Sequence, residues 1–347
     1  MIGIMRNLRA SIGLFVLLIS IMAATIAAVQ AQDQVTTPTP APAKSATPGP
    51  TSTQPQGETS EAAAELSQAD GDEPFTPLTQ ADLQSITGNV QRPNGITYFN
   101  DYLYIACTGD GTVYETNSRT GQTRAYIFGV TNAHSMIAEE IDNQLVLWVP
   151  DYSENSIKRV SRAGVETIAD EFEGPWALIP YNEDQFLVSN LLGGSVDRVT
   201  RDGEVEVLLD DLAGPTGLAL DGDLLYVGNN GSTRRSIEWF DLSAAEPTTG
   251  PLLSGIQNTT GLQLAVDGNL YFAYALGTRG VIGRIDPVAC RENGGCTNEQ
   301  VEIVVYTELA TPLAGLTITP DMRLFVHTMF NPSVYWGQIG ESPANGG

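Results

Sequence analysis

A short stretch in the middle of the chain shows the pattern that organises the rest. Residues 215–229, "PTGLALDGDLLYVGN", contain a turn, an apolar run, an Asp-Gly turn, a second apolar run and a final Asn. Apolar and β-branched runs bounded by Gly, Pro and Asp turns predict two strands of a β-hairpin. An isolated hairpin cannot bury its own hydrophobic face, so other parts of the chain must cover it.

The same turn-and-hairpin pattern recurs six times along the chain. The small residue before the first apolar run stands at Gly95, Ser135, Ala177, Gly217, Gly261 and Gly315, with spacings of 40, 42, 40, 44 and 54 residues. A third strand-like run follows each hairpin, and the first five units add a fourth. A period of about 40 residues with four strands is typical of a propeller blade. The sequence therefore predicts an all-β, six-bladed β-propeller with four-stranded blades over residues 77–340.

The sixth repeat lacks a fourth strand before the chain ends at Gly347. Upstream of the first repeat, the segment "LQSITGNVQRPNG" matches the end of the fourth blade, "VEVLLDDLAGPTG", with Ile86 placed as Leu208 is. We therefore expect residues near 82–88 to form the outer strand of the last blade and close the ring.

The first 31 residues have the pattern of an export segment. Arg6 and Arg9 precede an uncharged apolar run, and small residues at Val29 and Ala31 fit a cleavage site. The run is also long enough to remain as a membrane anchor, and both interpretations stay open. Residues 32–76 are rich in Pro, Thr, Ser and Ala, which predicts a disordered linker, and 341–347 a flexible tail. We expect a secreted, periplasmic or surface-tethered protein, with membrane contact through the N-terminal segment if it is uncleaved.

The net charge narrows the possible partners, and the cysteine positions predict which thiols are paired. The chain has 41 acidic and 17 basic residues, a net charge of −24, which disfavours nucleic acid as a partner. Cys290 and Cys296 flank a short loop, and in an oxidising compartment we expect them to form a disulfide. Cys107 lies in an apolar run and is expected to be a buried free thiol.

Candidate site residues follow from their places in the repeat. The residue leading into each innermost strand, here called the lead-in position, and the residue ending the second strand, the exit position, both lie at the same end of the central channel. Oxygen-rich side chains there suit a cation or a polar ligand. These positions supply seven ligand-binding candidates: Asn94, His134, Asp151, Trp176, Asn190, Asn229 and Tyr274. Asp and Asn at strand ends are also common turn residues that bind their own blade.

The pattern G-L-x-x-D-G-x-L-Y-V-x-N resembles NHL-repeat proteins and the SMP-30/gluconolactonase group of six-bladed propellers. Relatives in that group hold a divalent cation, usually Ca²⁺, through a Glu in an "EGP" element, an Asn in a "PNG" element, a further Asn and an Asp. The resemblance implies Asn94, Glu173, Asn190 and Asn229 as metal-ligand candidates. Here "PNG" at 93–95 precedes "EGP" at 173–175, the reverse of the order in the group, and the Asp has no evident match.

Motifs for catalysis are few, which shapes the functional expectation. The chain has no G-x-S-x-G, H-E-x-x-H or P-loop motif, and His134 and Asp151 are the candidates for a catalytic base. We expect a monomeric, non-catalytic propeller that binds a small polar molecule, glycan or protein at its channel mouth. The alternative is a divalent-metal-dependent hydrolase of the SMP-30/lactonase type.

Overall fold

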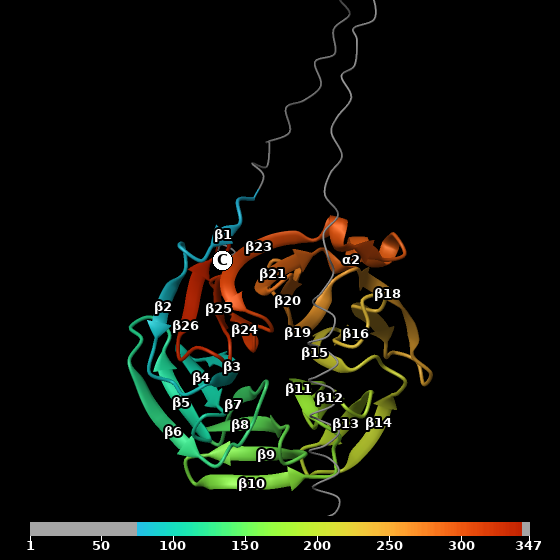
Figure 1. Cartoon of the computed structure of the whole chain (residues 1–347). Helices are drawn as coiled ribbons and strands as arrows, with labels where there is room; N and C mark the ends of the chain where they lie inside the picture. Colours follow the sequence, from blue (N-terminus) through green and yellow to red (C-terminus); the bar gives the residue numbers. More distant parts are fainter. Residues whose placement is uncertain (1–74, 342–347) are drawn as a thin grey trace, which may run out of the picture. The chain divides into compact units, whose positions relative to one another are not determined.

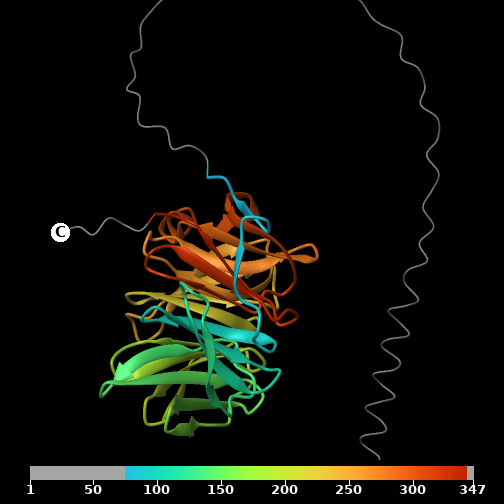
Figure 2. The same ribbon diagram turned by 90° about the vertical axis from the view of Figure 1, so that its left-hand side faces the viewer.

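Six mainly antiparallel β-sheets surround a central axis, and each sheet is one blade of a propeller (Figure 1). The structure is a computed structural model, and it describes residues 75–341. Figure 2 shows the same ring from the side. The all-β, six-bladed fold expected from the repeat is therefore confirmed. The expectations for residues 1–31, for the linker up to residue 74 and for 342–347 lie outside the described residues.

The first three blades each have four strands in sequence order from the axis outward. Their innermost strands begin at the small-residue turns of the repeat. The strands are β3 (Pro93–Phe99), β4 (Tyr102–Cys107), β5 (Thr112–Asn117) and β6 (Thr123–Phe128); β7 (Ile137–Ile141), β8 (Gln144–Asp151), β9 (Ser156–Ser161) and β10 (Gly164–Ala169); and β11 (Pro175–Pro180), β12 (Gln185–Asn190), β13 (Ser195–Thr200) and β14 (Val205–Leu209).

The last three blades have the same core order with additions at the outer edge. Their main strands are β15 (Pro215–Asp221), β16 (Leu224–Asn229), β17 (Ile237–Asp241) and β18 (Thr248–Ser254); β19 (Gln257–Leu264), β20 (Leu270–Leu276), β21 (Arg279–Ile285) and β23 (Glu302–Ala310); and β24 (Gly315–Ile318), β25 (Arg323–His327) and β26 (Val334–Gln338).

The N-terminal segment closes the ring, as the repeat predicts. Strand β2 (Gln84–Thr87) pairs antiparallel with β26, with Ser85 opposite Tyr335, and so completes the sixth blade. The sequence did not reveal a second addition: β1 (Leu78–Thr79) pairs parallel with β23 of the fifth blade. Just before it, the ring of Phe75 lies 4.9 Å from the guanidinium carbon of Arg284. The N-terminal segment therefore joins two neighbouring blades.

Hydrophobic clusters fill the spaces between neighbouring blades. One of them joins Ile96 and Leu103 of the first blade to Phe325 and Val334 of the sixth. The innermost strands approach closely at the small residues of the repeat: a Cβ on Gly217 would lie 2.5 Å from the backbone nitrogen of Leu262 in the next blade. A side chain there would collide with backbone, so a glycine is needed at this position.

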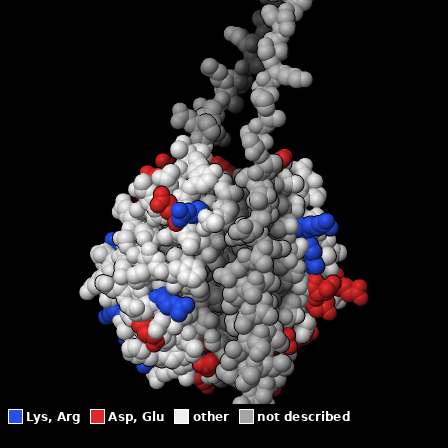
Figure 3. Space-filling view, in the orientation of Figure 1, with Lys and Arg blue, Asp and Glu red and all other residues white. Residues whose placement is uncertain are grey.

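On the face seen in Figure 3, acidic and basic groups are scattered among uncharged residues rather than gathered in one patch.

Charged side chains also connect neighbouring blades at the end of the ring opposite the lead-in positions. We call it the hairpin end, because the turns between the first and second strands of the blades lie there. The turns between the third and fourth strands of blades one, two and three each place an arginine against an acid of the preceding blade. The three pairs are Arg119–Asp321, Arg162–Glu115 and Arg201–Glu139.

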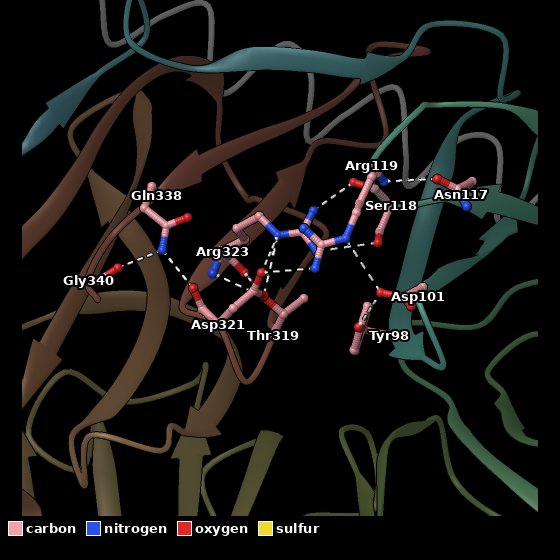
Figure 4. A network of polar contacts seen from close by, with 10 residues as sticks. All are labelled: Tyr98, Asp101, Asn117, Ser118, Arg119, Thr319, Asp321, Arg323, Gln338 and Gly340. Atoms are coloured by element: carbon pink, nitrogen blue, oxygen red, sulfur yellow. Dashed lines mark hydrogen bonds and ion pairs between the residues drawn. The ribbon is translucent and has the colours of Figure 1, made fainter. Parts of the chain in front are cut away.

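Figure 4 shows the first of these pairs, where blades six and one meet. There the buried Arg323 also donates to the Ser118 carbonyl at 2.8 Å.

The longest repeat spacing contains an insertion between β21 and β23. Helix α2 (Pro287–Glu292) begins after Asp286, whose side chain accepts from two backbone N–H groups. A disulfide links Cys290 to Cys296, as expected, and β22 (Cys296–Thr297) then extends the fourth blade by pairing parallel with β18. A short 3-10 helix, η1 (Asn298–Gln300), follows. Neither α2 nor any other described helix is long and apolar enough to cross a membrane.

Candidate functional site

Side chains at the lead-in positions meet across the ring axis. The Trp176 indole nitrogen, from the third blade, donates to the carbonyl of Thr260 in the fifth blade at 3.0 Å. The His134 ring, from the second blade, stacks on the Trp176 ring with 3.4 Å between their centres. Asn94 of the first blade places its amide nitrogen 3.5 Å from His134 Nε2. Together, Asn94, His134, Trp176 and Thr260 form what we call the aromatic roof at the lead-in end of the channel.

His134 is held as a neutral imidazole within this roof. Burial lowers the pKa of His134 to about 3, because the charged form would lose its hydration. Tyr152 contacts the ring edge-on, with 5.4 Å between centres. The buried Nδ1 atom has no hydrogen-bond partner. At neutral pH the side chain is therefore an uncharged polar group, whereas a cationic imidazolium is excluded.

The exit position of the second blade faces its own blade. Asp151 is fully buried, and its carboxylate accepts from Lys158 Nζ at 2.8 Å and from the backbone nitrogen of Thr131 at 2.8 Å. Lys158 is also buried and reaches a second acid, Glu154, at 2.9 Å. These donors occupy Asp151, so it is not free to act as a catalytic base.

The exit residues of blades three and four have the opposite arrangement. Asn190 donates its amide hydrogens to Asp197 at 2.6 Å, and Asn229 donates to Glu238 at 2.7 Å. Because a carboxylate accepts only, these partners fix which side of each amide is nitrogen. The two amide oxygens must then face away from the third strand, and both are buried without a hydrogen-bond partner. Burial raises the pKa of Asp197, and hydrogen bonds from Ser195 and Asn190 oppose that shift.

The remaining predicted residues lie in different surroundings. Asn94 is fully buried; its amide nitrogen donates to the Asn132 side chain at 2.6 Å, and its oxygen has no partner. Glu173 is exposed and flanks Gly193 together with Asn190: a Cβ on Gly193 would lie 3.1 Å from the Glu173 Cβ and 3.3 Å from the Asn190 Cβ.

Two further exit positions lie within the packed blades. Tyr274 is in the apolar cluster that joins blades four and five, where burial raises its pKa to about 12. Cys107 is a buried free thiol, as expected, and burial raises its pKa to about 12.

Below the roof, the innermost strands enclose a cavity of about 380 Å³ along the axis. Its lining runs from His134 and Trp176 at the lead-in end to Tyr98 and Pro320 near the hairpin end. No residue of the exit loops lines it. The candidate site therefore has two parts: the roof with the cavity, and the exit residues Asn190 and Asn229 with Glu173, none of which lines the cavity.

Comparisons with known proteins agree with this architecture. No protein-family model matches the chain, and no curated protein sequence matches it. Among solved structures, the chain is similar to a putative gluconolactonase (15% identity, TM-score 0.58, covering 74% of this chain and 91% of that one). It is also similar to a gluconolactonase from Xanthomonas campestris (16%, TM-score 0.56, 73% and 88%) and to the calcium-binding protein regucalcin from Agrobacterium tumefaciens (14%, TM-score 0.57, 77% and 96%).

These similarities confirm the fold resemblance that the repeat pattern implied. At 14–16% identity they establish the six-bladed architecture. They do not establish the activity, which has to be argued from the residues of this chain.

The chemistry of the buried oxygens bears on whether a divalent cation fits. Asn94, Asn190 and Asn229 each carry a buried amide oxygen without a partner, and hard cations such as Ca²⁺ prefer oxygen ligands of this kind. Glu173 supplies a carboxylate beside Asn190. Within residues 75–341 no three His, Cys, Asp or Glu side chains cluster as a metal site. By type, the candidate donors are three amide oxygens and one acid, rather than a cluster of carboxylates.

The sequence analysis missed the third-strand partners of the exit residues. Lys158, Asp197 and Glu238 stand seven, seven and nine residues after Asp151, Asn190 and Asn229. A charged residue seven to nine positions after the exit residue, in three successive blades, was the available signal. It also missed the reach of Trp176 across the axis, which no spacing in the sequence encodes.

Proposed function

We propose that the domain is a hydrolase of neutral cyclic esters that works with a divalent cation at the lead-in end of the channel. The observation that carries the proposal is the set of three buried amide oxygens, of Asn94, Asn190 and Asn229, that lack any partner. An unpaired buried polar atom is costly, and a cation bound within reach of such oxygens would offset that cost. The likeness to proteins described as gluconolactonases and as calcium-binding adds support.

The residues that would hold the cation are Asn94, Asn190, Asn229 and Glu173. When bound, a divalent cation polarises an ester carbonyl and lowers the pKa of a coordinated water. The non-catalytic binding role that the sequence alone favoured has no support from the similar proteins, and it becomes the alternative outcome of the test.

His134 is the residue of this chain best placed to donate a hydrogen bond to a substrate oxygen as a neutral imidazole. The Asn94 amide lies next to Nε2, so Nε2 can accept its hydrogen and the ring proton then rests on Nδ1. The Nδ1 atom is buried without an acceptor, so a side-chain movement that exposes its hydrogen would let it donate to the carbonyl oxygen of a neutral ester. Trp176, stacked on the ring, holds the imidazole in this orientation.

Metal analysis combined with a lactone hydrolysis assay tests the proposal. We expect the purified protein to bind one divalent cation, to hydrolyse a lactone, and to lose that activity with a chelator until the cation is restored. Asn190→Ala and Asn229→Ala should each weaken cation affinity about tenfold, a loss of about 1.4 kcal/mol. The matched control is Asn182→Ala, an exposed asparagine at a hairpin turn.

Two outcomes would overturn the proposal. Hydrolysis that is indifferent to chelator would remove the cation from the mechanism. A bound cation with no turnover of any lactone would indicate a binding protein.

A further inference from the structure

The axial cavity is built from one repeated position of the blade. Two residues after each lead-in position, every blade contributes an aliphatic residue that lines the cavity and also packs into the hydrophobic cluster between blades. The six, which we call the aliphatic belt, are Ile96, Met136, Leu178, Leu218, Leu262 and Leu316. The cavity volume of about 380 Å³ is in the range that binds small organic molecules.

The lining of the cavity is uncharged, although the chain as a whole carries a net charge of −24. Among the described residues, no Asp, Glu, Lys or Arg lines it. Several polar groups in the lining already have partners. The Gln263 amide binds both the backbone nitrogen and the carbonyl of Ile318, and the Ser135 hydroxyl binds backbone atoms of Trp176 and Leu178. A charged ligand would find no group of opposite charge there.

The cavity faces the hairpin end of the ring. The aromatic roof spans the lead-in end, where Trp176 of blade three reaches Thr260 of blade five. Tyr98 and Pro320 line the cavity at its other end, and Pro320 is exposed. Figure 4 shows Tyr98 beside Asp101 and Arg119, in the network that surrounds this end between blades six and one. A ligand that enters from the hairpin end meets the aliphatic belt before it meets His134.

We infer that the cavity selects a neutral molecule with an apolar tail and one polar head, with the head at the roof and the tail along the aliphatic belt. For a substrate, this inference rests on the proposed hydrolase function and names its class: lactones with an alkyl chain rather than sugar lactones. Burial of each methylene of the tail removes apolar surface from water. Affinity should therefore rise with tail length until the belt is filled.

Calorimetry with alkylcyclopentanones tests this inference without relying on catalysis. These ketones have a neutral carbonyl head and cannot be hydrolysed. Between the butyl, hexyl and octyl compounds, we expect affinity to rise about three- to fourfold per added methylene. Octanoate, which has a charged head, and gluconolactone, which is hydroxylated, should bind at least tenfold more weakly than the octyl ketone. Equal affinity across the series, or preference for gluconolactone, would overturn the inference.

Substitutions at one belt position locate the binding. Leu316 is half-buried, so Leu316→Glu places a charge in the channel with less disturbance than at the buried belt positions. We expect it to weaken octyl ketone binding at least tenfold, whereas Leu316→Met should retain affinity within about threefold. The control is Val266→Glu, at an exposed turn of the fifth blade. If Leu316→Glu fails to fold, the ketone series on the unmodified protein still decides the question.

The two proposals fail in different ways. If the ketones bind as expected and no lactone is hydrolysed, the cavity assignment stands and the hydrolase function falls. If lactones are hydrolysed with no dependence on tail length, the hydrolase function stands and the apolar substrate class is wrong.

Discussion

Blades two and three both bind the exit residue to a residue of the third strand, but the acid stands on opposite sides of the contact in the two blades. In blade two the exit residue is an acid, Asp151, and its third-strand partner is a base, Lys158. In blade three the exit residue is an amide, Asn190, and its partner is an acid, Asp197. Blade four follows blade three, with Asn229 and Glu238. The repeat conserves the geometry of the contact within each blade while the charges are exchanged.

The difference has a functional consequence. In blade two, every strong donor near Asp151 points at it, so the acid is fully used by its own blade. In blades three and four, the acid takes the amide hydrogens and leaves the amide oxygens buried without partners. Blade two is therefore self-contained at its exit position, whereas blades three and four leave ligand-binding capacity unused.

The largest expected effect comes from removing the base of blade two. Lys158→Met leaves the buried Asp151 carboxylate without its counter-ion, and loss of one partner of a buried pair costs about 3–5 kcal/mol. Urea denaturation at pH 7.5 measures the free energy of unfolding. The double variant Asp151→Asn with Lys158→Met should recover much of the loss, because it removes the stranded charge. A loss below about 1 kcal/mol in the single variant would mean that blade two is not self-contained in this way.

Acid provides a second test of the polar groups, comparing blade two with blade six. Burial lowers the pKa of His134 to about 3 and that of His327 to about 4, below the ordinary value of 6.5. The folded state therefore prefers both neutral, so their contribution to stability is present above pH 6.5 and is lost as the pH falls toward 4 and 3. Between pH 7.5 and 4.5 each should cost about 2–3 kcal/mol.

His327→Leu isolates the contribution of blade six. This side chain is fully buried and neither ring nitrogen has a hydrogen-bond partner, so an apolar replacement removes a titrating group and strands no hydrogen-bond partner. The variant should lose less stability than the unmodified protein when urea denaturation is repeated at pH 4.5. An identical acid loss in both proteins would show that His327 titrates normally.

The fold could be predicted from the sequence because each blade repeats the same local rules. Turn residues, apolar alternation and a period near 40 residues fix the strands, and the missing strand of the sixth unit points to Gln84–Thr87. The disulfide followed from a short Cys-flanked loop. Strand β1 escaped prediction because two residues, Leu78 and Thr79, carry no periodic signal.

The sequence predicted less of the candidate site than of the fold. The repeat correctly places lead-in and exit residues at one end of the ring, but it does not say which way a side chain turns. Asp151, Asn190 and Asn229 turn toward the third strands of their own blades, and their partners lie there. Trp176 crosses to Thr260 because the ring radius and its rotamer allow it, and both are properties of the assembled fold.

Removal of the disulfide at the outer edge of blade four should have a smaller effect on the free energy of unfolding. Blade two has no such bridge to remove. The Cys290–Cys296 bridge closes the insertion whose strand β22 extends that edge. For so short a loop, the chain-entropy relation gives about 2–3 kcal/mol. Replacement of both cysteines by serine should lower the free energy of unfolding by that amount and leave cation binding unchanged. Loss of cation binding in this variant would mean that the insertion supports the channel and not the edge alone.

The smallest expected effect on stability is also the most direct test of the comparison. Asp197→Ala in blade three removes the acceptor that fixes the Asn190 amide, and a lost charge-assisted hydrogen bond costs about 1–2 kcal/mol. No counter-ion is stranded, so the loss should be well below that of Lys158→Met in blade two. The same variant should weaken calcium affinity about tenfold, because the Asn190 oxygen is no longer held away from the third strand. Glu206→Ala, which breaks an exposed ion pair of the same blade, is the control and should change stability by less than about 1 kcal/mol and calcium affinity not at all. A destabilised Asp197→Ala protein with unchanged calcium affinity would show that the amides of blades three and four serve their own blades, as Asp151 does in blade two.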